Sequence, residues 1–260
     1  MISEWLTSLF AKSIPGAKKL GLVDEAVAIR ARYERHKRNW RPHIERTKST
    51  ITSALAETPK NRAALVLGAG ECIDIPLSSL VRHRAGGYLL DAVNLPAIRG
   101  RIRPYSNIDY ILYDVTGFID DSKKQASMPK LRRRPGLIVS CNMLSQIYLP
   151  FVNFPPQDED DLIIQRMIVE EHIKMLKYGP APALLISDYK KIVKQGDQSE
   201  TYATLPADLL EEGALLGPPE NEWDWDICPT GELGKDIRAQ LKVGVWRFPY
   251  RPETPVKEKD

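Results

Sequence analysis

Two glycines and two aspartates are spaced so that they could serve one ligand. Gly68 and Gly70 lie in AALVLGAGECIDIPL, where an apolar run is followed by a Gly-x-Gly turn and the start of a helix. Asp91 ends the next apolar run, and Asp114 ends the one after that. Glycine lets a ligand approach the backbone, and an acid at a strand end accepts hydrogen bonds from ribose hydroxyls. The pattern predicts an adenosine-binding edge, with Asp91 on the ribose and Asp114 near the adenine.

Five short apolar runs are expected to be the strands that carry these residues. They span 63–69, 88–93, 109–115, 136–141 and 183–189. Most are apolar nearly throughout, as in strands covered by helices on both faces. Between the last two runs, acids at 159–161 and a glycine at 179 mark the start and end of a helix. Strands alternating with helices predict an α/β fold with a doubly wound, mostly parallel sheet.

Both ends of the chain are expected to add to this sheet. Residues 1–58 are predicted to be helical throughout, with an apolar stripe from Leu22 to His43 on one helix face and a break at Pro42 near Trp40. The segments WDWDICPTGEL and LKVGVWRFPY predict an antiparallel hairpin at a sheet edge. The predicted division is a helical cap over 1–58, a ligand-binding domain over 59–250 and a flexible tail over 251–260.

Polar residues after the later strands are candidates for gripping a substrate. Asn142 follows the fourth predicted strand, and its amide supplies both a donor and an acceptor. Its alternative role is that of a turn residue that holds local backbone. Gln146, Asp188 and Tyr189 are further candidates for the substrate pocket.

The histidines are weaker candidates. His43 lies on the apolar stripe beside Trp40, where a packed histidine is commoner than a catalytic one. If the N-terminal helices cover the site, however, His43 is the best available general base. His83 and His172 are expected at the surface.

Residues 62–190 resemble the core of the class I, Rossmann-like S-adenosylmethionine-dependent methyltransferases. LVLGAG resembles their glycine-rich motif, LLDAV the ribose-binding acid, YDVTG the third-strand acid and GLIVSCNMLSQI the fourth-strand segment. WRPHIERTKSTI, GAGECIDIPL and VSCNMLSQ are also similar to an uncharacterised bacterial group within that superfamily. The resemblance implies a Rossmann-like fold, S-adenosylmethionine as the cofactor and methyl transfer to a small-molecule or polar metabolite acceptor. The implied cofactor edge consists of Gly68, Ala69, Gly70, Asp74, Asp91, Ala92, Asp114, Val115 and Ser140.

The chain departs from that family at two places. Val66 stands where an acid often helps to position the methionine amino group of the cofactor, so Glu71 or Asp74 is expected to substitute from the loop. Capping of the next helix is an equally good role for Asp74. At the fourth strand, Ser145 and Gln146 stand where the family often has histidines, so no general base is evident there.

Several other functions remain open. The basic segment from Arg30 to Lys48 could serve a nucleic-acid (RNA) methyltransferase, although a solvated helix face is favoured because no nucleic-acid module accompanies it. The missing acid and histidines keep open a catalytically inactive binding or scaffold protein. A nicotinamide oxidoreductase is opposed by Ile73, which replaces the third glycine of the dinucleotide fingerprint.

Composition restricts the setting of the protein. The net charge of +3 and the hydrophobic fraction of 43% are those of an ordinary globular chain. No apolar run is long enough for a membrane helix, and three scattered cysteines indicate neither a disulfide framework nor a metal site. A reduced, cytoplasmic protein is predicted, with a homodimer possible and no membrane partner.

Overall fold

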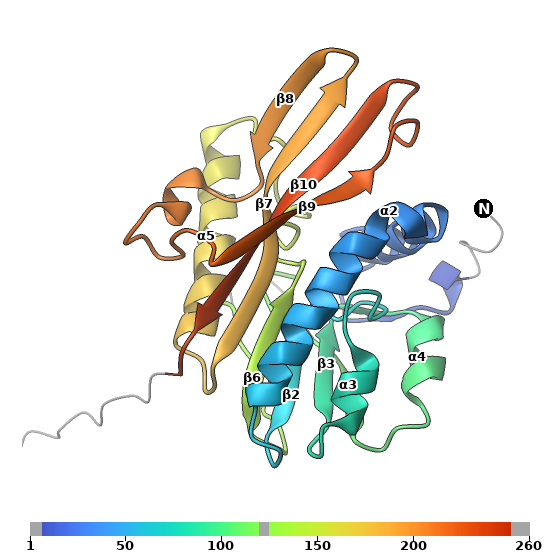
Figure 1. The fold of residues 1–260 in the computed structure, drawn as a ribbon, viewed down its shortest axis with the longest axis vertical. Helices are drawn as coiled ribbons and strands as arrows, with labels where there is room; N and C mark the ends of the chain where they lie inside the picture. Colours follow the sequence, from blue (N-terminus) through green and yellow to red (C-terminus); the bar gives the residue numbers. More distant parts are fainter. Residues whose placement is uncertain (1–6, 120–124, 251–260) are drawn as a thin grey trace, which may run out of the picture.

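An eight-stranded sheet runs through residues 7–119 and 125–250, the part of the chain that this computed structural model describes (Figure 1). Across the sheet the strands are β5 (Ile108–Leu112), β3 (Gly87–Asp91), β2 (Ala63–Leu67), β6 (Pro135–Cys141), β7 (Ala183–Gln195), β10 (Ile237–Phe248) and β9 (Asn221–Cys228). The eighth, β8 (Gln198–Ala203), pairs with the far end of β7. The tail 251–260 and residues 1–6 lie outside the described residues.

The first five strands along the path are parallel, and the order of the chain reverses among them. The strands β5, β3, β2, β6 and β7 are parallel, whereas β10 is antiparallel to both β7 and β9. The chain moves from β2 outwards through β3 to β5, and then returns to the other side of β2 as β6. The carboxyl ends of β2 and β6 therefore flank a topological switch point, where sheets of this kind bind ligands.

Alternate residues of the central strand face two helical layers. Ala64 and Val66 of β2 share a hydrophobic cluster with α2 (Leu22–Glu57) and α3 (Leu77–Arg82). Ala63, Leu65 and Leu67 share another with α5 (Glu159–Lys177). The helix α4 (Pro96–Ile102) packs beside α3, and a short 3₁₀ helix spans Ala207–Leu210. This two-faced burial explains why β2 is apolar at every position, and it confirms the predicted doubly wound α/β fold.

The strand predictions hold with shifted limits. All five predicted strands are present, and the C-terminal pair is the predicted antiparallel hairpin, with β9 at the sheet edge. The fifth strand was expected to end at residue 189, but β7 continues to Gln195 and turns at Gly196 into β8. The polar outer half of β7 lacks the apolar pattern of a core strand because it protrudes beyond the sheet as a hairpin.

The N-terminal prediction is wrong in two details. Residues 7–58 are not helical throughout, because β1 (Lys12–Ser13) pairs with β4 (Val93–Asn94) and a turn through Gly16 and Gly21, both with positive φ, precedes α2. The helix α2 is continuous through Pro42 and has its irregular residue at His36 (φ −117°, ψ 26°), rather than a break at Trp40. A proline disturbs the helical turn that precedes it, so the distortion lies upstream of Pro42.

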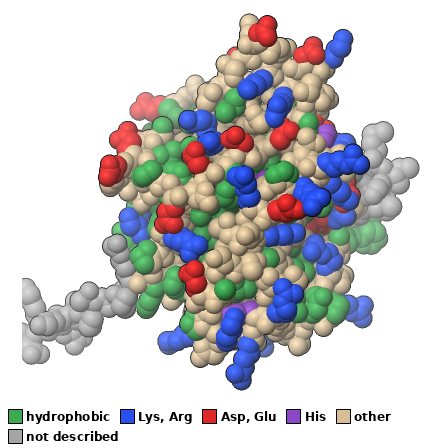
Figure 2. Space-filling view, in the orientation of Figure 1, with side chains coloured by type: hydrophobic (Ala, Val, Ile, Leu, Met, Phe, Trp, Pro, Cys, Tyr) green, Lys and Arg blue, Asp and Glu red, His purple; other side chains and the backbone are tan. Residues whose placement is uncertain are grey.

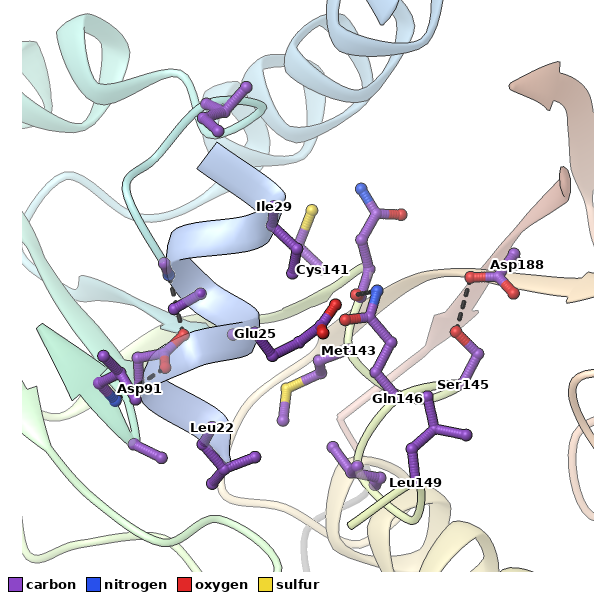
Figure 3. A pocket seen from close by; sticks show the side chains of 18 of the residues that line it. Leu22, Glu25, Ile29, Asp91, Cys141, Met143, Ser145, Gln146, Leu149 and Asp188 are labelled. Carbon is purple, nitrogen blue, oxygen red and sulfur yellow. Dashed lines mark hydrogen bonds between the residues drawn. The ribbon is translucent and has the colours of Figure 1, made fainter. Parts of the chain in front are cut away.

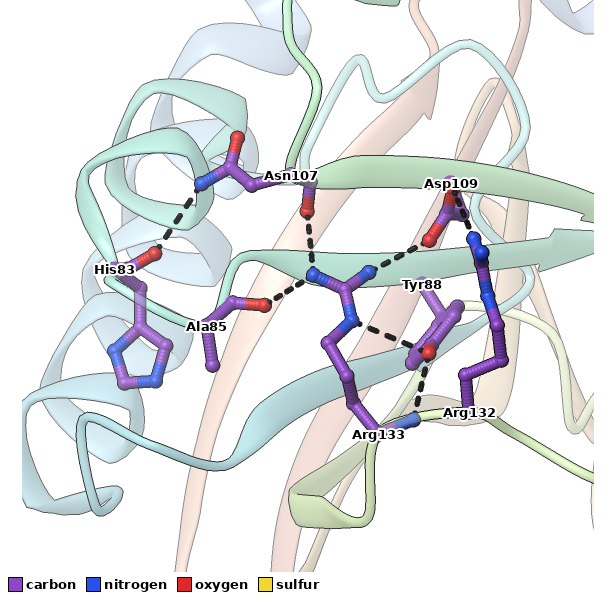
Figure 4. A network of polar contacts seen from close by, with 7 residues as sticks. All are labelled: His83, Ala85, Tyr88, Asn107, Asp109, Arg132 and Arg133. Atoms are coloured by element: carbon purple, nitrogen blue, oxygen red, sulfur yellow. Dashed lines mark hydrogen bonds and ion pairs between the residues drawn. The ribbon is translucent and has the colours of Figure 1, made fainter.

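Charged side chains of both signs are interspersed over much of the face drawn in Figure 2. One predicted basic cluster, residues 130–134, has a structural role at the amino end of the sheet (Figure 4). Arg133 Nη1 donates to Ala85 O at 2.6 Å, and its Nη2 donates to Asp109 Oδ2 at 2.6 Å. Its guanidinium also lies over the ring of Tyr88, 4.6 Å from the centroid. Arg133 thereby ties the segment that enters β6 to β3 and β5.

Candidate functional site

A cavity of about 650 Å³ lies at the carboxyl ends of the parallel strands, under α2. Its wall is built by the segments that follow β2, β3, β5 and β6, by β7 and β9, and by the first half of α2 (Figure 3). Most of the predicted site residues line it, namely His43, Gly68, Ala69, Gly70, Asp74, Asp91, Ala92, Asp114, Val115, Asn142, Gln146 and Asp188. The strand ends thus bring together residues that are up to 145 positions apart in the sequence (43 to 188).

The glycine turn at the end of β2 is tight on one side and open on the other. Gly68 has φ +72°, and a Cβ built there would lie 2.8 Å from the Cβ of Met143. Gly70 has φ +46°, and a Cβ there would meet nothing within 4 Å. Gly68 therefore serves the close approach of the β2 and β6 loops, whereas Gly70 leaves free space beside the cavity.

Asp91 holds this turn from the neighbouring strand. Its Oδ2 accepts from the backbone N–H of Gly70 at 2.9 Å, and its Oδ1 accepts from the N–H of Val93 at 3.0 Å (Figure 3). Burial raises the pKa of this carboxyl group, while the backbone hydrogen bonds lower it. Each carboxylate oxygen has two lone pairs, so both oxygens keep one for a ligand in the cavity.

Asp114 uses its carboxylate to shape its own loop. Its Oδ1 accepts from the N–H groups of Thr116 and Gly117 at 2.9 and 3.0 Å, and from the Thr116 hydroxyl at 2.6 Å. Its Oδ2 accepts from the N–H of Ile119 at 2.9 Å. The side chain lines the cavity, but four hydrogen bonds turn it into the frame of the wall. Its role towards adenine stays a prediction.

Two predicted site residues lie away from the cavity. The hydroxyl of Ser140 is buried on the opposite face of β6, 2.9 Å from Nε2 of His172 on α5. The hydroxyl of Tyr189 donates to Oε2 of Glu222 at 2.6 Å. Successive side chains of a strand point to opposite faces, so a strand that reaches the site does not bring every residue to it. Neither Ser140 nor Tyr189 is among the residues that line the cavity.

The helix α2 brings His43 to the cavity, but in an environment that opposes proton uptake. The ring is 1% exposed, stacks on Trp225 with centroids 3.9 Å apart, and accepts at Nδ1 from Nε1 of Trp223 at 3.0 Å. Burial lowers the pKa of His43 to about 3. His43 is therefore neutral near pH 7 and a poor general base there.

His83 and His172, expected at the surface, are both buried. His83 is 2% exposed, and its Nε2 lies 2.8 Å from the carbonyl oxygen of Arg62. His172 is fully buried against Ser140, and burial lowers its pKa to about 4. The polar helix pattern around His172 indicated an exposed face because it does not reveal that a strand residue partners the ring.

Acid should destabilise the protein as the buried histidines gain protons. An unfolded histidine has a pKa near 6.5, whereas burial lowers those of His43 and His172 to about 3 and about 4. The unfolded chain therefore binds more protons below pH 6.5, and each histidine lowers the free energy of unfolding by about 1.4 kcal/mol per pH unit down to its folded pKa. Urea unfolding of wild type and His172→Gln at a series of pH values measures this. The stability deficit of the variant should shrink as the pH falls; a deficit that is constant with pH would contradict a neutral, buried His172.

Asn142 stands between His43 and Asp74 at the end of β6. Its Nδ2 lies 3.0 Å from Nε2 of His43 and 2.6 Å from Oδ2 of Asp74. Asn142 adopts φ +49°, a conformation that asparagine tolerates better than most residues. Burial raises the pKa of Asp74. These contacts place Asp74 beside Asn142 rather than in a helix cap, since α3 begins at Leu77 with no side-chain cap.

The other end of the cavity combines aromatic walls with a second buried acid. Phe151, Phe154 and Trp225 line it, and Asp188 is 3% exposed. Oδ1 of Asp188 accepts from the hydroxyl of Ser145 at 2.6 Å, as Figure 3 shows. Burial raises the pKa of Asp188. Sequence reasoning proposed the aromatic tail mainly as core, and Trp225 serves as both core and cavity wall.

Contacts between α2 and two loops were not predicted. Arg30 forms an ion pair with Oε2 of Glu71 in the glycine loop, while Oε1 of Glu71 is buried and has no hydrogen-bond partner among the described residues. Arg35 and His36 contact the two carboxylate oxygens of Glu232, in the β9–β10 loop, at 2.5 and 2.7 Å. These partners lower the pKa of Glu232 to about 2. The interleaved charges of α2 give no sequence signal for such distant partners.

Two further searches concern metals and membranes. Within residues 7–119 and 125–250, no three His, Cys, Asp or Glu side chains are grouped as a metal site would require. No helix in the described part of the chain is long and apolar enough to cross a membrane.

Comparison with known proteins adds a likeness of fold. No family model and no curated protein matches the sequence. Among solved structures, the chain is similar to the 1,6-didemethyltoxoflavin-N1-methyltransferase of Burkholderia thailandensis, solved with 1,6-didemethyltoxoflavin and S-adenosylhomocysteine (13% identity, TM-score 0.41, 79% of this chain and 78% of that one). It is also similar to the N-methyltransferase NodS of Bradyrhizobium japonicum, solved with S-adenosylhomocysteine (12% identity, TM-score 0.35, 78% and 88%). Because these overall similarities are low, the function has to follow from the geometry of this chain.

Proposed function

We propose that the chain is an S-adenosylmethionine-dependent methyltransferase that acts on a small-molecule or polar metabolite acceptor. The observation that carries the proposal is the arrangement of Gly70, Asp91 and Asp114 around one cavity at the switch point of the sheet. Asp91 already orients both carboxylate oxygens through backbone hydrogen bonds, and the open side of Gly70 leaves space beside it. This arrangement suits the ribose of an adenosine group.

The charge of the glycine loop favours this cofactor over a dinucleotide. Ile73 occupies the position of the third fingerprint glycine, and Glu71 places a buried carboxylate oxygen without a partner in the cavity wall. A carboxylate there would repel a pyrophosphate, whereas it would attract the ammonium group of S-adenosylmethionine. Glu71 is therefore our candidate for the acid that is missing at Val66.

Methyl transfer requires a nucleophile that is held in line with the methyl group. The bound cofactor would supply that methyl group as an electrophile on its sulfonium. We place the acceptor at the end of the cavity formed by Phe151, Phe154 and Trp225, where Asn142, Gln146 and Asp188 offer polar contacts. Since His43 has a pKa of about 3, we expect an acceptor atom that attacks without losing a proton to a histidine.

The basic N-terminal segment supports a small acceptor rather than a nucleic acid. Arg30 and Arg35 are paired with Glu71 and Glu232, and Arg41 lies 2.7 Å from Glu45. Cations that are neutralised within the protein contribute less to phosphate binding. The nucleic-acid methyltransferase stays the alternative function, and the inactive scaffold stays a further one.

The location and assembly are further proposals. Cys72, Cys141 and Cys228 are all buried as free thiols, which supports a reducing, cytoplasmic compartment. The segment 1–58 is proposed to cover the cofactor site, which the contacts of α2 with the glycine loop support. A homodimer stays a prediction.

Calorimetric titration with S-adenosylmethionine, S-adenosylhomocysteine and NAD tests the proposal. We expect saturable, micromolar binding of the first two ligands and none of NAD. Binding of NAD alone would overturn the cofactor assignment. Turnover is then sought with small acceptors and with RNA, where a steep salt dependence of RNA binding would favour the alternative function.

Asp91→Ala should weaken S-adenosylhomocysteine binding by about 1–3 kcal/mol, because it removes the ribose acceptor and leaves the N–H groups of Gly70 and Val93 without their partner. The affinity is measured by calorimetry at a temperature where the variant is folded. Asp109→Ala, at the opposite end of the sheet, is the control, and its affinity should equal that of wild type. Equal affinities for wild type and Asp91→Ala would refute the ribose assignment.

A further inference from the structure

The contacts of Trp223, His43, Asn142 and Asp74 form one continuous hydrogen-bonded chain. The distances are 3.0 Å from Trp223 Nε1 to His43 Nδ1, 3.0 Å from His43 Nε2 to the Asn142 amide, and 2.6 Å from that amide to Asp74 Oδ2. The last two contacts meet at one atom of the amide. Because one end of the chain has a fixed donor, the hydrogens of the whole chain can be assigned in sequence.

The indole nitrogen of Trp223 only donates, so Nδ1 of His43 has to accept. A neutral imidazole with an accepting Nδ1 carries its hydrogen on Nε2, which then donates to the Asn142 amide. The amide atom at that point has to be the oxygen, because two donors cannot share a hydrogen bond. Oxygen and nitrogen of an amide are assigned from such networks, so the amide of Asn142 is turned by 180° relative to the drawn assignment.

The turned amide has a consequence for Asp74. Its Oδ2 now lies 2.6 Å from the Asn142 oxygen, and two oxygens this close require a hydrogen between them. We propose that Asp74 is a protonated, neutral positioning residue that donates to Asn142 and thereby directs the amide NH₂ group of Asn142 towards the ligand in the cavity.

The surroundings of Asp74 agree with a neutral acid. The carboxyl group is enclosed by Cys141 and Asn142, and the nearest cation that acts on it is Lys48, whose effect is smaller than that of burial. Cys72 and Cys141 are themselves buried, uncharged thiols at neutral pH, because burial raises the pKa of both. No described residue forms an ion pair with Asp74 that would stabilise its charged form.

The NH₂ group takes the place of the amide atom for which the described residues provide no hydrogen-bond partner. Asn142 lines the cavity, so we infer that a ligand supplies the partner, and that this ligand group is a hydrogen-bond acceptor such as a carboxylate or carbonyl oxygen or an unprotonated ring nitrogen. This use of the NH₂ group rests on the proposed function, whereas the protonation of Asp74 does not.

Infrared difference spectroscopy between wild type and Asp74→Asn at neutral pH tests the protonation. We expect wild type to show the carbonyl stretch of a protonated carboxyl group, shifted in D₂O and absent from the variant. Asp160→Asn, at an exposed position of α5, is the matched control and should remove a carboxylate band instead. Loss of a carboxylate band in Asp74→Asn would overturn the proposal. Asp74→Asn keeps a donor towards Asn142, so we expect it to fold.

Nitrogen NMR of wild type labelled in the histidine rings is an independent measurement that needs no variant. The chain has only four histidines, and His43 is assigned by its loss in His43→Gln. We expect hydrogen on Nε2 and none on Nδ1, whereas hydrogen on Nδ1 would overturn the proposal. Both measurements are made without cofactor or acceptor, so they can succeed even if the methyltransferase assignment fails.

Titration of Asn142→Leu with S-adenosylhomocysteine distinguishes the two sources of the ligand group. A marked loss of affinity assigns the partner of the NH₂ group to the cofactor. An unchanged affinity, together with a raised KM for the acceptor in turnover, assigns it to the acceptor. If both the affinity and the KM equal those of wild type, the role of the NH₂ group in ligand binding is refuted.

Discussion

Gly70→Ala is expected to fold nearly as well as wild type and to lose most of its affinity for the cofactor. A Cβ at this position meets nothing within 4 Å of the protein, so the only cost to folding is the positive φ of +46°, which costs a residue with a side chain about 1 kcal/mol. Gly70 lines the cavity, and its methyl group would occupy space that we assign to the cofactor. The affinity for S-adenosylhomocysteine is measured by calorimetry and the stability by urea unfolding.

Gly68→Ala is the contrasting variant in the same turn. Its Cβ would lie 2.8 Å from the Cβ of Met143 and 3.0 Å from the carbonyl oxygen of Cys141, in addition to a φ of +72°. The two loops would have to separate, so we expect a clear loss of stability. If Gly70→Ala bound the cofactor as tightly as wild type, the open side of the turn would not be the cofactor site.

Trp225→Ala should cost about 3–5 kcal/mol of unfolding free energy, as large aromatic truncations in a core do. Trp225 is 5% exposed, stacks on His43 and meets the ring of Trp40 edge-on at a centroid distance of 4.9 Å. It therefore joins α2 to the sheet as well as lining the cavity. Urea unfolding followed by circular dichroism measures the loss.

Trp225→Phe is the matched control because it keeps an aromatic ring between His43 and Trp40. It removes an indole N–H that is buried and has no hydrogen-bond partner among the described residues. We therefore expect a much smaller loss than for the alanine variant. Equal losses in the two variants would show that the indole nitrogen, rather than ring packing, provides the stability.

The glycine turn and the strand-end acids could be predicted because each depends on local sequence. An apolar run that ends in Gly-x-Gly is a local pattern, and the parallel sheet brings the carboxyl ends of its strands to one edge. Asp91 and Gly70 accordingly meet through a hydrogen bond of 2.9 Å. The same reasoning missed β8, since the polar outer half of a protruding hairpin lacks the apolar pattern of a strand.

The side on which each residue lies was harder to predict. Ser140 and Asn142 are two positions apart, yet only Asn142 lines the cavity, because the chain leaves the strand at Asn142 with a positive φ. Tyr189 follows Asp188 directly and points away from it. Alternation along a strand assigns residues to two faces, but it does not show which face is open to a ligand.

By itself, the sequence determined the doubly wound sheet, the glycine turn and the place of Asp91, because periodicity and turn residues act over short distances along the chain. Only the tertiary structure decided the protonation states at the site. The environment of His43 comes from Trp223 and Trp225, which lie about 180 positions further along the chain, and that of Asp74 comes from the strand that ends at Cys141. Ionisation depends on burial and on hydrogen-bond partners, and here both are supplied by segments that meet only when the chain folds.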